Sequence, residues 1–159
     1  MRCFGFTLTE LLVSLSVLSV LLGFAAPSWR QTQDKVQLIS LYQQLIHDVQ
    51  TARVQALQRG TTLKLLRTTG CAWGSSNAAD WSCGWQLQVA ETGEVLASHR
   101  SEFALRIVFS NTTPLSINGQ GNLSGLGVRW VFQTAAGLTQ VVCINTTGRI
   151  RSTVGDTCS

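Results

Sequence analysis

Residues 1–26 constrain the fold most strongly, because a long apolar run there contains a single carboxylate. The run begins in the stretch Gly5-Phe6-Thr7-Leu8-Thr9-Glu10-Leu11-Leu12, and residues 11–26 carry no charged side chain. As a helix, about 21 residues would cross a hydrocarbon core of about 30 Å. A carboxylate inside such a segment is costly unless it has a partner. The pattern therefore predicts an apolar N-terminal helix in which Glu10 has a specific role.

The G-F-T-L-T-E-L-L stretch resembles the class III leader of type IV pilins and type II secretion pseudopilins. In that family a prepilin peptidase cuts after the glycine and methylates the new N-terminus, which implies cleavage between Gly5 and Phe6. The resemblance also implies that Glu10 pairs with the N-terminal amine of a neighbouring subunit, which would offset the cost of burying its charge. The implied partners are other pilin subunits, the prepilin peptidase and the inner membrane. The implied location is the inner membrane of a Gram-negative bacterium before assembly, then a periplasmic or extracellular pilus.

Two other interpretations of the N-terminal segment remain open. It can act as an uncleaved signal anchor, or secretory cleavage can occur near Gly23-Phe24-Ala25, where small residues are present. Neither interpretation accounts for Glu10. We therefore expect a leader at 1–5, a transmembrane or filament-core helix at 6–27, and a periplasmic domain at 28–159, with an amphipathic helix at 28–60 and a β-rich part at 61–159.

The hydrophobic pattern beyond Pro27 predicts a helical segment followed by strands. Apolar residues recur at three- and four-residue steps up to Arg59-Gly60, which is a suitable helix end. The expected stripe consists of Val36, Ile39, Tyr42, Ile46, Val49 and Ala56, widened by Leu38, Leu41 and Leu45. Alternating patterns then predict strands at 61–67, 84–90, 95–100, 105–109, 128–133 and 140–144. This order indicates an α+β fold, and the resemblance implies its pilin-like form, with a long N-terminal helix packed on antiparallel β-sheets.

The cysteines indicate an exported, disulfide-bonded domain. Cys3 lies in the leader, and the mature chain would retain four others: Cys71, Cys83, Cys143 and Cys158. An even set in an exported domain is typical of disulfides. Three connectivities are possible, and we expect local pairing, Cys71 with Cys83 and Cys143 with Cys158. These spacings are too wide for a typical zinc site, so we predict no metal.

The sequence lacks the motifs that usually indicate an enzyme. It contains no G-x-S-x-G, Walker loop, H-E-x-x-H or acidic metal cluster. The glycine-rich stretch 119–127 does not open a helix, so it suits tight turns better than a phosphate cradle. His47 and Asp48 are neighbours on the helical segment and point in different directions, which favours surface or boundary roles. We therefore predict a non-enzymatic protein without a cofactor.

The most informative polar stretch is residues 146–153. The formal net charge is +4, and Arg149 and Arg151 lie two residues apart within this stretch. In an extended chain both guanidinium groups would project from one face, about 6.6 Å apart, while Ile150 points to the core. Such a pair can engage phosphates of a nucleic acid backbone without reading sequence. Two arginines on a strand are by themselves most often solvated or salt-bridged.

Over essentially its whole length the chain resembles the GspH/FimT/FimU group of minor pilins and pseudopilins. Gly148-Arg149-Ile150-Arg151 resembles the G-R-x-R motif of the FimT members, which bind DNA in natural transformation. The resemblance therefore implies non-specific DNA binding by Gly148, Arg149 and Arg151, with DNA as a partner. From charge alone we add Arg100, Arg106 and Arg129 as an extension of the basic face. The alternative is a structural minor pilin or pseudopilin of the FimU or GspH type, which assembles a pilus or type II secretion system without binding DNA.

Tryptophans could make a second kind of contact with nucleic acid, by stacking on bases. Trp73 and Trp81 lie inside the expected Cys71–Cys83 loop, where exposure would allow a base to stack on them. Trp85 and Trp130 fall within expected strands and are therefore predicted to lie in the core.

Overall fold

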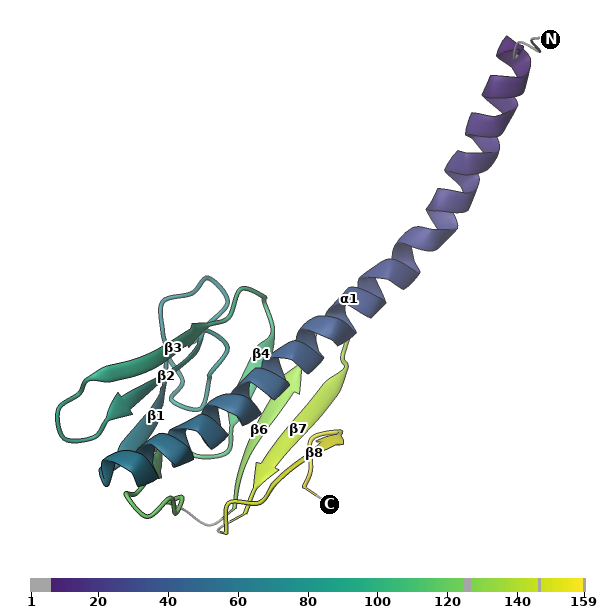
Figure 1. Cartoon of the computed structure of the whole chain (residues 1–159). Helices are drawn as coiled ribbons and strands as arrows, with labels where there is room; N and C mark the ends of the chain where they lie inside the picture. The colour runs from purple at the N-terminus through teal and green to yellow at the C-terminus, as the bar shows by residue number, and fades with distance from the viewer. Residues whose placement is uncertain (1–6, 125–126, 146, 159) are drawn as a thin grey trace, which may run out of the picture. The chain divides into compact units, whose positions relative to one another are not determined.

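The computed structural model describes residues 7–124, 127–145 and 147–158, and for residues 23–28 and 30 it describes the backbone alone (Figure 1). Gly5 and Phe6, the expected cleavage site, lie outside the described residues. One α-helix, α1, runs from Leu8 to Arg59. The helix assignment continues through Pro27, so the two expected helical segments form one element. Gly60 ends α1 with a φ of 64°, which glycine adopts without strain.

The chain divides after Asp34 into two compact units, which are described separately. In the first unit, the described apolar side chains of α1 are exposed, as at Leu8 and Leu21. Within the described residues, no helical stretch combines the length and hydropathy that crossing a membrane requires. The transmembrane segment expected at 6–27 begins outside these residues.

The second unit, residues 35–159, contains two four-stranded sheets in which all paired strands are antiparallel. The first sheet has the order β3-β2-β1-β5 and the second has the order β4-β6-β7-β8. The strands of the first are β1 (Leu63–Arg67), β2 (Gly84–Val89), β3 (Val95–Arg100) and β5 (Leu115–Ile117). Those of the second are β4 (Arg106–Phe109), β6 (Val128–Gln133), β7 (Thr139–Ile144) and β8 (Ile150–Val154).

Six of the strands agree with the sequence pattern to within two residues at each end. The pattern missed β5, which has three residues and follows Pro114. It also gave no strand assignment to β8, an edge strand whose three central residues are Arg, Ser and Thr and so show no apolar alternation. β8 nevertheless contains Arg151, one of the two arginines of the G-R-x-R motif.

One hydrophobic core joins the C-terminal half of α1 to both sheets, which this part of the helix crosses in Figure 1. The buried positions of α1 are Leu38, Leu41, Leu45, Val49, Ala52 and Ala56. The expected stripe was wrong at its start, because Val36 is 60% exposed. This part of α1 is apolar over a wide face, and the sheets cover the side that carries Leu38, Leu41 and Leu45.

Aromatic residues fill the centre of the core around the second sheet. Trp81 lies 4.9 Å from Phe109 and 5.8 Å from Trp130, measured between ring centroids. Trp130 and Trp85 are buried as predicted. The predicted exposure of Trp81 is wrong, since the side chain is 2% exposed. Its backbone N–H donates to Ile107 O at 2.8 Å, which fixes the residue against β4 and directs the indole inward.

Candidate nucleic-acid interface

The turn between β7 and β8 is closed by hydrogen bonds around Asn145. Its backbone N–H donates to Arg149 O at 3.1 Å, and its carbonyl accepts from Gly148 N at 2.9 Å. The Asn145 side-chain oxygen Oδ1 also accepts from Arg149 N at 2.7 Å. Gly148 has a φ of 79°, the left-handed conformation that short hairpin turns favour in glycine. The turn is therefore a structural reason for glycine at this position of the G-R-x-R motif.

Arg53 of α1 ties this turn to the rest of the domain. Its Nη1 donates to Gly148 O at 3.1 Å, and its Nε donates to Gly121 O at 3.0 Å. One planar guanidinium group thereby holds two loops against the helix. Sequence reasoning missed Arg53, because its partners lie 95 and 68 residues away and no local pattern marks them.

Strand register places the predicted arginines on one side of the second sheet. Arg129 on β6 is opposite Cys143 on β7, which is opposite Arg151 on β8. Directly opposed residues in antiparallel strands share a face. Arg106 on β4 is opposite Gln133, which lies four residues after Arg129 and so also faces this side.

We call this side of the sheet the arginine face and define it by Arg106, Arg129, Arg149 and Arg151, all of which are exposed. Arg149 belongs to it because it lies two residues before Arg151 and continues the pairing with Asn145. The opposite side carries the buried Trp130 and Val142. Ile150, between Arg149 and Arg151, is partly buried against the core, as predicted.

The four guanidinium groups of the arginine face have no protein partner within the described residues. No carboxylate there lies within 4.0 Å of them, and none of them donates a hydrogen bond. By contrast, Arg59 lies 3.9 Å from Glu94, and Arg67 donates to Ser75 O and Ser76 O. The face therefore presents positive charge that remains available to an anion.

The second disulfide holds the end of the chain against the arginine face. Cys143 and Cys158 are bonded, with Cα atoms 5.9 Å apart, in the local pairing expected from the sequence. Gly155 N donates to Thr139 O at 3.0 Å, which continues the contact between the chain end and β7. Closing a loop of 15 residues in this way contributes about 3 kcal/mol in the chain-entropy model.

The structure does not bring Arg100 to this face. It lies at the end of β3 in the first sheet, where it is opposite Gly84. Of the three residues added from charge, the structure therefore brings Arg106 and Arg129 together on this face and places Arg100 elsewhere. The grouping could not be resolved from sequence, because it depends on which sheet each strand joins.

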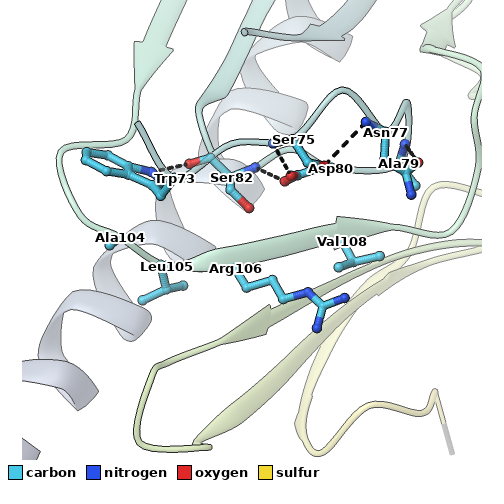
Figure 2. Close-up of a pocket in the computed structure, with 10 residues that line it drawn as sticks. All are labelled: Trp73, Ser75, Asn77, Ala79, Asp80, Ser82, Ala104, Leu105, Arg106 and Val108. Carbon is cyan, nitrogen blue, oxygen red and sulfur yellow. Dashed lines mark hydrogen bonds between the residues drawn. The ribbon is translucent and has the colours of Figure 1, made fainter. Parts of the chain in front are cut away.

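The loop between β1 and β2 borders a cavity of about 360 Å³ next to β4 (Figure 2). The Cys71–Cys83 disulfide closes this loop, again in the expected local pairing. Gly74 lies so close to the two sulfur atoms that a Cβ there would overlap Cys83 Sγ. Figure 2 shows Trp73 at one end of the cavity, the loop along one wall and the segment Ala104–Val108 along the other.

Asp80 organises this loop through backbone hydrogen bonds. Its Oδ2 accepts from Ser75 N at 2.7 Å and its Oδ1 accepts from Ser82 N at 2.9 Å. Burial raises the pKa of Asp80, but hydrogen bonds from Ser75 and Ser82 outweigh that effect and lower the pKa to about 2. The carboxylate therefore stays ionised at neutral pH. Sequence reasoning missed Asp80, although its place beside Ser and Asn residues in a loop is typical of such local bonding.

Asp48 has a structural partner in the core. Its Oδ2 accepts from Trp85 Nε1 at 2.7 Å, and its Oδ1 accepts from Gln44 Nε2 at 2.9 Å. The neighbouring His47 is exposed. The surface or boundary roles predicted for these two residues are confirmed. Within the described residues, no group of three or more His, Cys, Asp or Glu side chains could hold a metal ion.

At the N-terminus, Glu10 lies in the first turn of α1 and is exposed. Its backbone N–H donates to Thr7 Oγ1 at 3.3 Å, which caps the start of the helix. A carboxylate in the first turn also interacts favourably with the helix dipole. Glu10 thus suits a helix start directly after the expected cleavage site.

Comparison with known families gives two matches along the chain. The family described as Type II transport protein GspH matches residues 42–148, more than half of the chain. The Prokaryotic N-terminal methylation motif matches residues 1–26. Comparison with curated proteins finds no match.

Two solved structures are similar, both of the type IV minor pilin FimU from Pseudomonas aeruginosa in different crystal forms. The first has a TM-score of 0.60 at 18% identity and covers 79% of this chain and 97% of that chain. The second has a TM-score of 0.52 at 18% identity and covers 74% and 96%. At this level of identity the likeness establishes the fold, which is pilin-like α+β as expected.

The methylation motif identifies a prepilin, which a prepilin peptidase processes and which is anchored in a membrane before it joins other pilin subunits. The fold and the family are those of structural, non-enzymatic subunits. The chain therefore belongs to the GspH family of minor pilins and pseudopilins.

Proposed function

We propose that this chain is a minor type IV pilin of the FimT kind, which captures DNA non-specifically and contributes to DNA uptake in natural transformation. The observation that carries the proposal is the arginine face. It combines the two arginines of the G-R-x-R motif with Arg106 and Arg129, and all four guanidinium groups lack a protein partner within the described residues.

The proposed mechanism is electrostatic capture of the DNA backbone. Arg149 comes directly before β8 and Arg151 lies within it, so an extended chain spaces them about 6.6 Å apart. Arg129 is two strands away from Arg151 in the same register, which corresponds to about 10 Å. Guanidinium groups at such separations can contact several phosphates of one DNA molecule, which positions the DNA without reading its sequence. The binding releases counterions and therefore weakens steeply with salt.

The segment that carries the arginines is held by contacts within the protein, which favours binding. Gly148, the Arg53 hydrogen bonds and the Cys143–Cys158 disulfide restrain the β7–β8 turn without any contact from DNA. Less conformational entropy is then lost on association. Several copies in one filament would strengthen a weak single contact through effective concentration.

The proposal includes the route by which the subunit reaches DNA. Cleavage between Gly5 and Phe6 would place Glu10 as the fifth residue of the mature chain. Its carboxylate would then pair with the N-terminal amine of a neighbouring subunit during assembly from the inner membrane of a Gram-negative bacterium. The assembled subunit would be periplasmic or extracellular.

A structural role without DNA binding is the second candidate, for a pilus or a type II secretion system. It is favoured by apolar side chains of α1 that remain exposed, namely Val36, Val54 and Leu57, at 60%, 52% and 55%. Such side chains suit contact with neighbouring subunits. The two candidates differ in whether the arginine face has a ligand.

Fluorescence anisotropy of labelled duplex DNA with the full chain in neutral detergent separates them. The test variant is Arg149→Ala with Arg151→Ala, and the control is Arg100→Ala with Lys35→Ala, which removes the same charge elsewhere. We expect the test variant to bind about tenfold more weakly or worse at low salt. We expect the slope of log K against log salt to fall by about 2. Equal binding by the test and control variants, both folded, would support the structural candidate.

A further inference from the structure

We propose that the cavity between the Cys71–Cys83 loop and β4 binds an unpaired, amino-bearing nucleobase of single-stranded DNA, stacked on Trp73. The inference rests on the proposed DNA binding and adds a substrate class to it. Its components are the position of the cavity, the exposed indole of Trp73 and the acceptor Asp80.

The cavity adjoins the arginine face through a shared residue. Arg106 lines this cavity of about 360 Å³ and also a second cavity of about 430 Å³ that Arg129 lines. In Figure 2 Arg106 extends from β4 below the loop. A strand whose phosphates lie along Arg129 and Arg106 would therefore bring its next base to the cavity. A volume of this size is at the lower end of small-molecule pockets.

Trp73 is oriented for stacking. It is 40% exposed, while its Nε1 donates to Ser82 O at 3.1 Å. This bond satisfies the only polar atom of the indole and leaves part of the ring in contact with solvent. The disulfide and the tight approach of Gly74 to the sulfur atoms hold the loop in place. An exposed aromatic ring near basic side chains is a common platform for single-stranded nucleic acid, and Arg106 lines the same cavity as Trp73.

Asp80 determines which part of a nucleotide can enter. It lines the cavity together with Ser75 and Ser82 and stays ionised at neutral pH. A carboxylate repels a phosphate but accepts a hydrogen bond from an exocyclic amine, such as N4 of cytosine. Thymine has no such amine. The cavity is therefore expected to favour cytosine over thymine and to leave phosphates to the arginines.

The base must be unpaired to enter, because a paired base is stacked within the duplex and its amine is occupied. Single-stranded DNA then gains a contact that duplex DNA lacks. The difference in affinity between single-stranded and duplex DNA therefore measures the contribution of the cavity separately from that of the arginine face.

The test measures anisotropy of labelled oligo-dC, oligo-dT and a duplex of equal length, with the full chain in neutral detergent. Trp73→Leu is expected to weaken oligo-dC binding about tenfold. Its duplex binding should stay within about twofold of wild type, because phosphate contacts are intact. Trp73→Phe keeps a ring and should restore part of the oligo-dC affinity. Trp29→Leu, the same substitution at an exposed site in the first unit, should change neither.

Asp80→Asn tests the acceptor separately. Wild type should bind oligo-dC more tightly than oligo-dT, and this preference should disappear in the variant. Thermal unfolding by circular dichroism confirms that each variant is folded. A folded Trp73→Leu variant with wild-type affinity for oligo-dC would overturn the cavity proposal.

The outcomes distinguish the two proposals. If Arg149→Ala with Arg151→Ala weakens binding to all three DNAs while Trp73→Leu changes none, DNA capture stands and the base site is refuted. If wild type binds none of the three DNAs at low salt, DNA capture itself is refuted. Selective loss of oligo-dC binding in Trp73→Leu supports both.

Discussion

The two disulfide-closed loops of the domain are similar in size but opposite in how they use their polar groups. The Cys71–Cys83 loop, with a sequence separation of 12, directs its polar atoms inward, since Asp80 accepts from Ser75 and Ser82. The Cys143–Cys158 loop, with a separation of 15, contains Arg149 and Arg151 without any partner in the described part of the chain.

The difference shows that a disulfide alone does not mark a binding site. Both bridges restrict the unfolded chain and stabilise the fold to a similar degree. The second loop differs because its two arginines have no protein partner in the described residues. Keeping like charges close together costs free energy, so their clustering is informative about function. The first loop offers a shaped cavity and an aromatic ring instead. Three predictions compare the two loops further.

Removing each disulfide is expected to have the largest effect. Cys143→Ser with Cys158→Ser, and separately Cys71→Ser with Cys83→Ser, should each lower the free energy of unfolding by about 3 kcal/mol. Only the former should also weaken duplex DNA binding, because it releases the arginine face. Denaturant titration and anisotropy measure the two effects. Equal loss of duplex binding in both variants would contradict the contrast between the loops.

Arg53→Met is expected to have the next largest effect. The change removes two charge-assisted hydrogen bonds, to Gly121 O and Gly148 O, and should cost about 2 kcal/mol. Hydrogen exchange should accelerate at the β7–β8 turn and remain unchanged in the Cys71–Cys83 loop. Arg59→Met on the same helix is the control, since its exposed ion pair with Glu94 contributes little. Unchanged exchange at the turn would show that Arg53 does not hold it.

Asp80→Asn should have a smaller and pH-dependent effect. The folded pKa of about 2 lies below the unfolded value of about 3.9, so the stabilisation is present above about pH 4 and lost as the pH falls towards 2. At pH 7 we expect the variant to lose about 1–2 kcal/mol, because solvent screens a partly exposed carboxylate. Urea unfolding between pH 2 and pH 7 measures this. Parallel pH curves for wild type and Asp80→Asn would refute the assignment.

Much of the fold follows from local pattern. The helix end at Gly60, the hairpin between β2 and β3 and the core positions of Trp85 and Trp130 depend on neighbours close in sequence. The prediction that Trp81 is exposed was wrong, because the pattern of a loop does not show that its backbone bonds to Ile107 of β4. An isolated tryptophan among small residues has no periodicity that could indicate burial.

The candidate site was predictable only in part. Arg149 and Arg151 share a face because two residues of a strand always do, and that could be deduced from their spacing. Arg129 and Arg106 join them only through strand order and register, which the sequence does not contain locally. Arg53 and Asp80 were missed because long-range or loop-specific hydrogen bonds decide their roles.

The position of Cys158 has a consequence for the timing of biosynthesis. It follows every residue of the arginine face in the chain, so the bridge to Cys143 can form only after the whole second sheet has been synthesised. It also requires an oxidising compartment, which the cytosol is not. In the cytosol, where the cell's own nucleic acids are present, a newly made chain would therefore carry these arginines on a segment that lacks the Cys143–Cys158 disulfide. The ordered surface would be completed only on export.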